Sequence, residues 1–385
     1  MNWKKSFYIL VLVILLVFSI LSWTRNKNES LNLEIPHDTY VQDPNNVYVF
    51  PPFYEVHKKD NLEFDISKIK TLNDKVTFSE SLRKKLFILA NFLTQPDKSP
   101  KIQIINEVDK GTYTEQKLSI KMYPSTISFA YMLIPKNVNY PAPLILAMHQ
   151  HGGNYENGKE EVVGNKGNPD LFYGKELAER GYLVFASDAP LFGDRVLKLK
   201  GENSPRTLED FGEESLILLG HSLLGETLRE DIVMLNLISS LKNIDQNKIG
   251  CIGHSFGGVR CMYLAAMDDR IKVVVLSNSV ANLRKKYEEA PVHTWFNILP
   301  GAAKYTETNG ILTLIAPRPL MVIYTEKDPI FPIDETESQI KPLKELYSKL
   351  YKETDFSSLK IPNEAHAFPE KYHEIVYKFL DKNLK

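Results

Sequence analysis

The stretch KIGCIGHSFGG, Lys248–Gly258, places a serine between two glycines directly after a short apolar run. Its residues Gly253–Gly257 match the pattern G-x-S-x-G, in which the serine lies at a tight turn from a strand into a helix. The glycines are needed because side chains two residues on either side of the serine would clash. The flanking runs predict that strand and that helix. We therefore expect Ser255 at a strained turn, with a helix N-terminus facing its hydroxyl.

A serine hydroxyl becomes a nucleophile when a base takes its proton, and the base needs an acid to orient it. Where the serine follows a strand in this way, the acid comes next along the chain and the histidine comes last. Asp328 lies just past the strand predicted for RPLMVIYT, and His366 lies in a loop past the strand predicted for SSLKIP. The sequence therefore predicts a catalytic triad of Ser255, Asp328 and His366.

Other residues compete for two of these roles. Glu326 is closer to the preceding strand than Asp328, and Asp334 lies beyond two prolines, where it can cap the next helix. His373 also follows the acid, but it lies inside a predicted helix, which favours a packing role. Asp328 and His366 remain the residues that we expect.

The loop HQHGG, residues 149–153, follows the apolar strand predicted for APLILAM. We expect an oxyanion site formed by the backbone N–H of Phe256 and by that of His151 or Gly152. A metal site at His149 and His151 is the alternative, but two histidines without nearby cysteine or carboxylate ligands are a weak zinc signal. We expect neither a metal ion nor an organic cofactor.

The segment Pro291–Tyr305, PVHTWFNILPGAAKY, is long and aromatic and lies between two predicted strands. It can line the substrate pocket or form a packed surface excursion. Asp188 and Arg195, after another strand, can shape the pocket or form an internal ion pair. The residues of the segment expected in the pocket are His293, Trp295 and Phe296.

From about Lys101 strands alternate with helices, which predicts βαβ units and a mostly parallel, doubly wound sheet. The first three strands, predicted for KIQIINEV, QKLSIKMYP and ISFAYMLIP, are expected to be antiparallel at one edge. In such sheets the site lies beyond the carboxyl ends of the strands, and every motif described above follows such an end.

At the N-terminus, Lys4 and Lys5 precede an uncharged run of 17 residues, Phe7–Trp23, which reaches the lower limit for a membrane-spanning helix. No small-x-small cleavage site follows it. We expect a signal anchor over residues 1–27, with the N-terminus inside and the catalytic body outside. A tether with one helix, capped by Ser79 or Ser81, is predicted over 28–100, and the catalytic domain over 101–385.

The 47 basic and 48 acidic residues almost cancel, which gives no support to a nucleic-acid partner. The two cysteines, Cys251 and Cys261, flank Ser255 on the predicted strand and helix. Small buried thiols are the expected state, ahead of a disulfide or a metal pair.

Five segments in order resemble the α/β-hydrolases, and most closely the dienelactone-hydrolase-like and acetyl-xylan-esterase-like branch of serine esterases. The resemblance covers about residues 101–385. It implies an α/β-hydrolase fold with an eight-stranded, mostly parallel sheet, helices on both faces and the triad named above. The segments are APLILAMHQHGG, GKELAERGYLVFASDAPLFGDR, NKIGCIGHSFGGVRCMYLAAMDDRIK, IAPRPLMVIYTEKDPIFP and EAHAFP.

These features predict a membrane-anchored serine hydrolase that cleaves carboxylic esters, with short acyl or acetyl groups, through an acyl-enzyme on Ser255. A peptidase or thioesterase on the same triad is one alternative. A peptidase of the prolyl-oligopeptidase type would need a propeller domain, for which some 100 preceding residues are too few. A non-catalytic, membrane-tethered binding protein is the other alternative. The expected partners are a small-molecule ester and the membrane, and the sequence does not determine the oligomeric state.

Overall fold

The computed structural model describes residues 61–92, 100–123, 126–196, 205–285, 294–351 and 355–385. The described residues fall in one compact unit, Val56–Lys385. The anchor expected over residues 1–27 lies outside them. None of the helices that the structure describes is long and apolar enough to cross a membrane.

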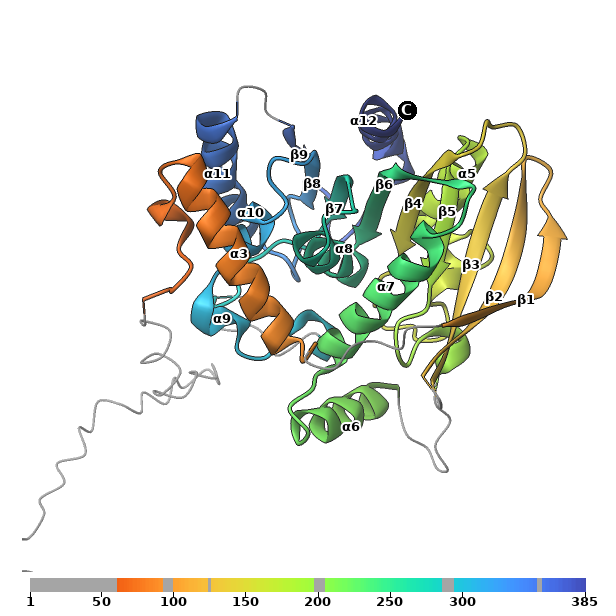
Figure 1. Ribbon diagram of the computed structural model, residues 1–385, viewed down its shortest axis with the longest axis horizontal. Helices are drawn as coiled ribbons and strands as arrows, with labels where there is room; N and C mark the ends of the chain where they lie inside the picture. The colour runs from red at the N-terminus through yellow and green to blue at the C-terminus, as the bar shows by residue number, and fades with distance from the viewer. Residues whose placement is uncertain (1–60, 93–99, 124–125, 197–204, 286–293, 352–354) are drawn as a thin grey trace, which may run out of the picture. The chain divides into compact units, whose positions relative to one another are not determined.

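In the described part of the chain, one sheet has nine strands in the order β1-β2-β3-β5-β4-β6-β7-β8-β9 (Figure 1). The first four in this order pair antiparallel, as expected for that edge, and all later pairs are parallel. The strands are β1 Lys101–Asp109, β2 Tyr113–Tyr123, β3 Thr126–Pro135, β4 Ala142–Met148, β5 Leu183–Ser187, β6 Ile244–His254, β7 Val273–Ser277, β8 Leu320–Thr325 and β9 Phe356–Ile361.

The family resemblance implied eight strands, and this number is wrong, because the sheet of the described residues has nine. The additional strand is at the antiparallel edge, where β1 pairs with β2 from Lys101↔Lys121 to Asp109↔Thr114. Apolar and polar residues alternate over Lys101–Ile104 of β1 and Lys117–Met122 of β2, as is typical of strands, and the pairing shifts register between Ile104 and Asn106.

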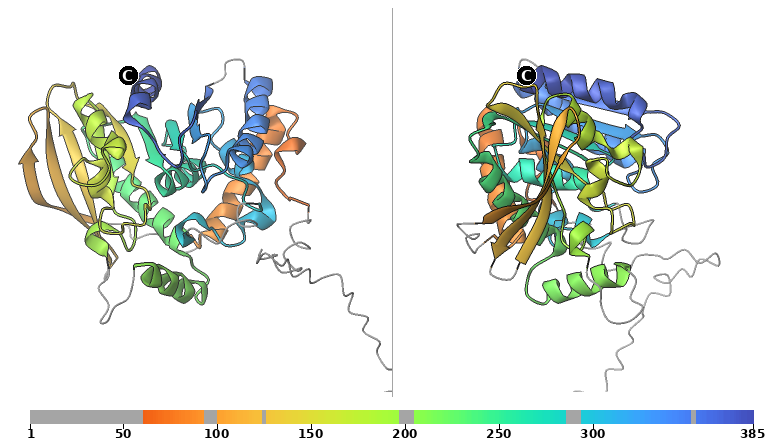
Figure 2. Two further views of the ribbon diagram at one scale, coloured as in Figure 1. Left: turned by 180° about the vertical axis from the view of Figure 1, so that it is seen from behind. Right: turned by 90° about the vertical axis from the view of Figure 1, so that its right-hand side faces the viewer.

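Helices cover both faces of the sheet, and the views from behind and from the side show the two layers (Figure 2). One layer contains α3 Leu72–Leu89, α7 Leu223–Ser239, α8 Phe256–Met267, α10 Thr308–Thr313 and α11 Ile333–Leu350. The other contains α4 Lys159–Val162, α5 Tyr173–Glu179 and α12 His373–Leu384. The short α9 Ala302–Tyr305 and α6 Pro205–Ile217 complete the α-helices of the described residues, with 3₁₀ turns at η2 Ile66–Lys68, η3 Pro169–Leu171, η4 Gly193–Arg195, η5 Trp295–Asn297 and η6 Glu370–Tyr372.

The core is divided by the sheet into two layers, and β4 shows why. Leu144 and Leu146 pack in the layer of α7 and α8, whereas Ile145 and Ala147 pack in the layer of α5 and α12. Because successive side chains of a strand point to opposite faces, a strand covered on both sides needs an uninterrupted apolar run. The segment APLILAM meets this requirement.

Helix α3 packs into the same core. Leu82 and Leu86 are fully buried, and Arg83 donates to the carbonyl of Ala266 near the end of α8 at 2.9 Å. Its cap differs from the expected Ser79 or Ser81. The helix begins one residue after Thr71, whose side chain forms a reciprocal capping box with Asp74.

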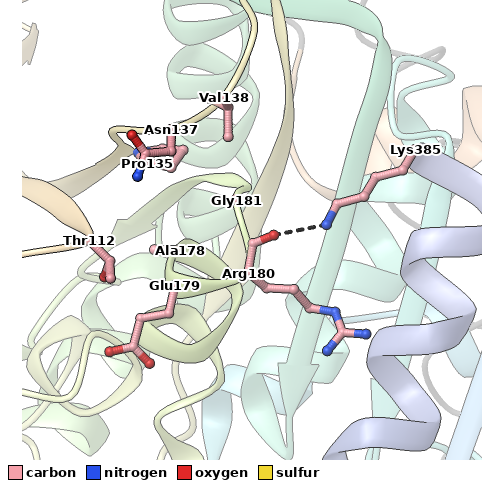
Figure 3. Close-up of a pocket in the computed structure, with 9 residues that line it drawn as sticks. All are labelled: Thr112, Pro135, Asn137, Val138, Ala178, Glu179, Arg180, Gly181 and Lys385. Atoms are coloured by element: carbon pink, nitrogen blue, oxygen red, sulfur yellow. Dashed lines mark hydrogen bonds between the residues drawn. The ribbon is translucent and has the colours of Figure 1, made fainter.

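A pocket lies at the amino ends of the parallel strands, between the end of β3, the end of α5 and the C-terminus (Figure 3). Lys385 Nζ donates to the carbonyl of Arg180 at 2.8 Å at its rim. Because Gly181 shortly precedes β5, this pocket is at the opposite end of the sheet from the turn after β6. It includes none of the residues predicted to form the site.

Candidate active site

Ser255 lies at the turn between β6 and α8, with φ 56° and ψ −125°. Positive φ is rare for a residue with a side chain and marks backbone strain held by the surrounding structure. A Cβ atom at Gly253 would overlap the backbone of Gly257, and one at Gly257 would overlap the carbonyl of Met148. The two glycines therefore let the turn close against the end of β4. The Ser255 N–H donates to the carbonyl of Ser277 at 2.8 Å, which ties the turn to β7.

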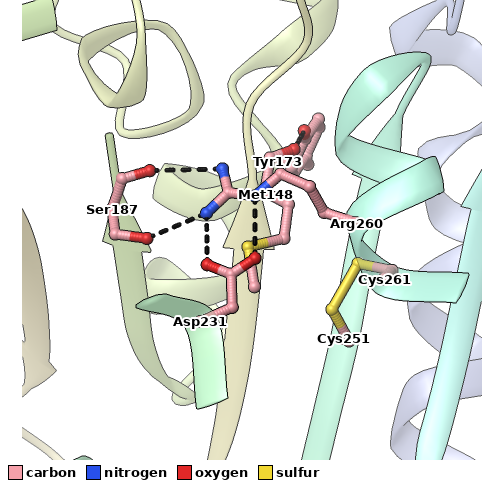
Figure 4. Close-up of a disulfide and its surroundings, with 7 residues drawn as sticks. All are labelled: Met148, Tyr173, Ser187, Asp231, Cys251, Arg260 and Cys261. Atoms are coloured by element: carbon pink, nitrogen blue, oxygen red, sulfur yellow. Dashed lines mark hydrogen bonds and ion pairs between the residues drawn. A yellow bond between two sulfur atoms is a disulfide. The ribbon is translucent and has the colours of Figure 1, made fainter. Parts of the chain in front are cut away.

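The expectation of two free thiols beside this turn is wrong, because Cys251 and Cys261 form a disulfide (Figure 4). Their Cα atoms are 5.7 Å apart, and both side chains are fully buried. The chain reverses at Ser255, so α8 folds back along β6 and brings the two cysteines together. One cysteine on the strand and one on the helix, ten residues apart on either side of a tight turn, is the sequence pattern that could have predicted this disulfide.

Arg260 fastens α8 to its neighbours (Figure 4). Its guanidinium is fully buried and binds Asp231 of α7 through two hydrogen bonds, of 2.6 and 3.1 Å. It also donates to the hydroxyl of Ser187 at the end of β5, at 3.1 Å. This paired, hydrogen-bonded charge fixes the helix that follows Ser255.

Asp328 and His366, which follow β8 and β9, are joined by a hydrogen bond of 2.7 Å from Nδ1 to Oδ2. Asn278 donates to the same oxygen at 2.6 Å, and the N–H groups of Ile330 and Phe331 donate to Oδ1 at 2.8 and 2.9 Å. Burial alone would raise the pKa of Asp328, but the hydrogen bond from His366 and those from the other donors hold it below its ordinary value. The group is therefore a carboxylate at neutral pH.

Because a carboxylate accepts the bond from Nδ1, His366 has its hydrogen on Nδ1 and a lone pair on Nε2. That Nε2 atom is buried and has no hydrogen-bond partner among the described residues, Ser255 included. The His366 ring lies 4.7 Å, between centroids, from the ring of His254, which immediately precedes Ser255. The structure thus brings His366 next to the strained turn, with no hydrogen-bond partner for Nε2 among the described residues.

The competing residues have other partners. Glu326 accepts the N–H of Asn363 at 2.9 Å, and Asp334 lies exposed on the first turn of α11, 3.3 Å from Lys285 Nζ. His373 is buried at the start of α12 and bonds to Glu176 through Nδ1 at 2.8 Å. Of the acids considered, only Asp328 contacts His366.

The first residue of the HQHGG loop, His149, has a structural role. Its Nδ1 bonds to the carbonyl of Gln150 at 2.7 Å, and its Nε2 accepts the N–H of Ala189 at 3.1 Å. Burial and, after it, the charge of Arg260 lower the pKa of His149 well below its ordinary value, so the ring is neutral. It fastens the loop after β4 to the loop after β5.

His151, the other histidine of this loop, also bonds to protein groups through both ring nitrogens. Gly153 N–H donates to Nδ1 at 3.2 Å, and Nε2 lies 2.8 Å from Oε2 of Glu209. Both glycines of the loop have positive φ, 58° for Gly152 and 68° for Gly153. No group of three or more histidine, cysteine or acidic side chains is placed to hold a metal ion in the part of the chain that the structure describes.

Of the three residues expected in the pocket, His293 lies outside the described residues. Phe296 is fully buried, with its ring 5.0 Å from that of Phe256, the residue after the serine. Trp295 donates through Nε1 to Asp210 of α6 at 2.8 Å. The described part of this aromatic segment therefore packs directly beside the turn.

Asp188 and Arg195 form internal ion pairs. Lys159 Nζ, fully buried, lies 2.6 Å from Asp188 and 2.5 Å from Asp194, while Arg195 pairs with Glu230. Burial raises the pKa of Asp188. No motif pointed to Lys159, because its partners Asp188 and Asp194 come close to it only in the folded chain.

Glu209 of α6 is a second residue that the motifs did not reveal. Its carboxylate is fully buried and accepts hydrogen bonds from His151, Tyr155, Thr294 and the N–H of Trp295. Burial alone would raise the pKa of Glu209, but the hydrogen bonds from His151 and Tyr155 hold it at about 2. A buried charge at this place connects the HQHGG loop to the aromatic segment.

A mostly parallel sheet covered on both faces, with a strained serine after β6 and an Asp–His pair after β8 and β9, defines an α/β-hydrolase. Residues 54–333 match the model of the Abhydrolase family. The chain belongs to this family.

The proteins that this chain resembles bear the names of hydrolases and esterases. YtaP of Bacillus subtilis (strain 168), provisionally named a hydrolase, is 29% identical over 270 residues, which are 69% of this chain and 87% of YtaP. A Bacteroides fragilis structure, provisionally assigned as an acetyl xylan esterase, matches with a TM-score of 0.69 at 20% identity over 80% of each chain. A glucuronoyl esterase from Solibacter usitatus matches with a TM-score of 0.57 at 14% identity, covering 85% of this chain and 98% of its own. The two structures show that the fold is shared.

Proposed function

We propose that this protein is a serine hydrolase that cleaves carboxylic esters through an acyl-enzyme on Ser255. The observation that carries the proposal is the Asp328–His366 pair, whose unused Nε2 lies beside the strained turn that presents the serine. This arrangement supplies a nucleophile, a base in the correct tautomer and an acid to hold it.

In the first half of the reaction, Nε2 of His366 takes the proton of Ser255 Oγ as the oxygen attacks the ester carbonyl. Asp328 holds the imidazole in place and stabilises its positive charge. The backbone N–H of Phe256, and that of His151 or Gly152, would donate to the developing oxyanion. The imidazolium then protonates the alkoxy oxygen of the ester as its bond to the carbonyl carbon breaks, and the alcohol leaves.

In the second half, His366 takes a proton from water as the water attacks the acyl-enzyme. The imidazolium then returns this proton to Ser255 Oγ as the bond between Oγ and the acyl carbon breaks, and the carboxylic acid is released. Every proton transfer uses a group of this chain or water. We propose short acyl or acetyl esters as substrates, because a structural neighbour bears the name of an acetyl xylan esterase. A panel of esters of increasing acyl length, with acetylated sugars, a thioester and a peptide, would distinguish these substrate classes.

A fluorophosphonate probe tests the mechanism directly, since it labels an activated serine. Wild type should be labelled, and Ser255→Ala should lose both labelling and ester hydrolysis. Ser279→Ala is the matched control, because this serine is also buried but belongs to the loop after β7. An unlabelled wild type, or equal labelling of Ser255→Ala, would refute the proposed function.

We also propose that the catalytic body is tethered to a membrane by residues 1–27 and lies outside the cytoplasm. The uncharged run Phe7–Trp23 and the Cys251–Cys261 disulfide support this, since disulfides persist mainly in oxidising compartments. Protease added to intact cells or spheroplasts should digest the body, and full protection until lysis would contradict the proposed topology.

A further inference from the structure

We propose that Glu209 is a positioning residue for the oxyanion site, acting through the side chain of His151. The inference rests on the proposed function, because it concerns the loop expected to hold the substrate oxygen. Glu209 touches none of the reacting atoms in this scheme. Its role is to fix the backbone that does.

The two oxygens of Glu209 bind two different segments. Oε2 bonds to His151 Nε2 at 2.8 Å and accepts the Tyr155 hydroxyl, so it contacts the loop after β4. Oε1 accepts Thr294 Oγ1 at 2.8 Å and the Trp295 N–H at 2.6 Å, so it contacts the segment before α9. One carboxylate therefore spans the two sides of the site.

The hydrogen bonds of His151 show how the charge acts on the backbone. Because the Gly153 N–H donates to Nδ1, that atom has no hydrogen, and Nε2 donates to Glu209. The ring thus connects the carboxylate to the turn formed by Gly152 and Gly153. Two consecutive glycines give this turn many alternative conformations, and a fixed ring selects one. The N–H groups of His151 and Gly152 are then held in a single direction.

The other oxygen fixes the facing wall. Thr294 and Trp295 begin the turn that carries Phe296, whose ring contacts Phe256 at 5.0 Å and His151 at 6.4 Å. Phe256 provides the second N–H of the expected oxyanion site. The carboxylate therefore sets the position of the HQHGG loop relative to the residue that follows the nucleophile.

The charge is suited to this role because it is buried and ionised. Hydrogen bonds to an ionised acceptor in a low dielectric are about twice as strong as neutral ones. Glutamine has the same shape but no charge. Its NH₂ group would replace one carboxylate oxygen and face either His151 and Tyr155 or Thr294 and the Trp295 N–H, which are donors themselves. Glu209→Gln should therefore loosen the turn without removing a catalytic group.

The test compares Glu209→Gln with Glu213→Gln in the full chain. Glu213 is also buried on α6, but its carboxylate accepts the N–H of Leu223 at the start of α7, at 2.6 Å. Glu209→Gln should lower kcat for an activated ester by about 10- to 100-fold with KM changed by less than about threefold, as expected for lost oxyanion stabilisation. Affinity for a trifluoromethyl ketone inhibitor should fall by a similar factor. Glu213→Gln should leave kcat and the inhibitor affinity within about threefold of wild type.

A double variant tests whether Glu209 acts through His151. The double variant Glu209→Gln/His151→Gln should have a kcat no more than about threefold lower than that of the more impaired single variant. The effects of substitutions at residues that act through one another do not add. Losses that multiply, or a folded Glu209→Gln with wild-type kcat and inhibitor affinity, would overturn the proposal. If Glu209→Gln does not fold, His151→Gln alone decides, and wild-type values there would overturn it as well. A wild type that the fluorophosphonate does not label would instead refute the esterase mechanism.

Discussion

Asp328 has four hydrogen-bond donors around its two oxygens, and this determines which atom of His366 can take a proton. Its Oδ1 is held by the backbone of Ile330 and Phe331, while Oδ2 receives Asn278 and His366. The carboxylate cannot rotate without losing these bonds. The hydrogen of His366 is therefore kept on Nδ1, and the lone pair is on Nε2.

We predict that Asp328→Asn lowers kcat by about 10³- to 10⁴-fold, because an amide N–H facing Nδ1 would favour the tautomer with its hydrogen on Nε2. Steady-state hydrolysis of an activated ester measures this effect. Asp334→Asn is the control and should keep wild-type kcat, since Asp334 is exposed and pairs with Lys285. Full activity in Asp328→Asn together with a loss in Asp334→Asn would move the acid role to Asp334.

At this scale, the sequence could predict the Asp328–His366 contact and the strained turn at Ser255, while the catalytic roles of these residues stay predictions. Ser255, Asp328 and His366 each follow a recognisable strand, and the required order fixes which acid and which histidine to choose. Glu209 and Lys159 were missed because their roles depend on partners brought together by loops far apart in sequence. The Cys251–Cys261 bond was missed for a different reason, since its partners were noted but their approach depends on how α8 folds back on β6.

The turn between β6 and α8 is held at three places. Gly257 lets it close on β4, the Ser255 N–H binds β7, and the disulfide joins the strand to the helix on either side. A strained serine is stable only where such contacts outweigh the cost of its conformation. The disulfide is the one of these contacts that can be removed without changing the turn itself.

We predict that replacing both cysteines by alanine lowers the free energy of unfolding by about 2–3 kcal/mol, because the ten-residue separation is a short loop in the unfolded chain. Chemical denaturation without reductant measures this. Labelling of Ser255 by the fluorophosphonate should persist at 25 °C, since the glycine contacts remain.

Reductant provides the control for this prediction. When wild type is unfolded and refolded in reductant, its free energy of unfolding should fall to that of the double variant. The free energy of unfolding of the variant should not change. Alkylation of wild type under native, non-reducing conditions should find no free thiol. Two modified cysteines in that experiment would show that the bond is absent.

The elements themselves were predicted well where the pattern is local. The antiparallel edge and the buried strands follow from alternation and from continuous apolar runs. The cap of α3 was misplaced because the polar positions Ser79 and Ser81 resemble caps, whereas the reciprocal bonds of Thr71 and Asp74 lie before the apolar stripe. The family resemblance implied eight strands, whereas the sheet of the described residues has nine, with β1 as the additional strand.

At the scale of the whole molecule, the described residues 61–92, which precede the predicted catalytic domain, belong to the same compact unit, Val56–Lys385. Leu82 and Leu86 of α3 are fully buried against the layer that contains α8, and the Phe64 N–H donates to the carbonyl of Tyr305 at 2.9 Å. A family resemblance that begins near residue 101 could not reveal this contact, because it gave no partner for the apolar stripe of the helix.

We predict that a chain truncated to residues 56–385 unfolds cooperatively and is labelled at Ser255 like the full chain. Truncation to 101–385 should reduce stability strongly, because it exposes the surface under α3, where a single buried leucine is worth about 2–5 kcal/mol. Thermal unfolding and labelling of both forms provide the measurement. Equal stability of the two truncated forms would show that α3 is dispensable.

The place of β9 in the chain has a consequence for biosynthesis. Strand β9 comes last in the chain among the strands of the described residues and lies at the edge of the sheet, and His366 follows it. On the proposed mechanism, a nascent chain on the ribosome therefore contains Ser255 and Asp328 before it contains the base, His366. On the same mechanism, a chain that stops before His366 contains the proposed nucleophile but has no base to activate it.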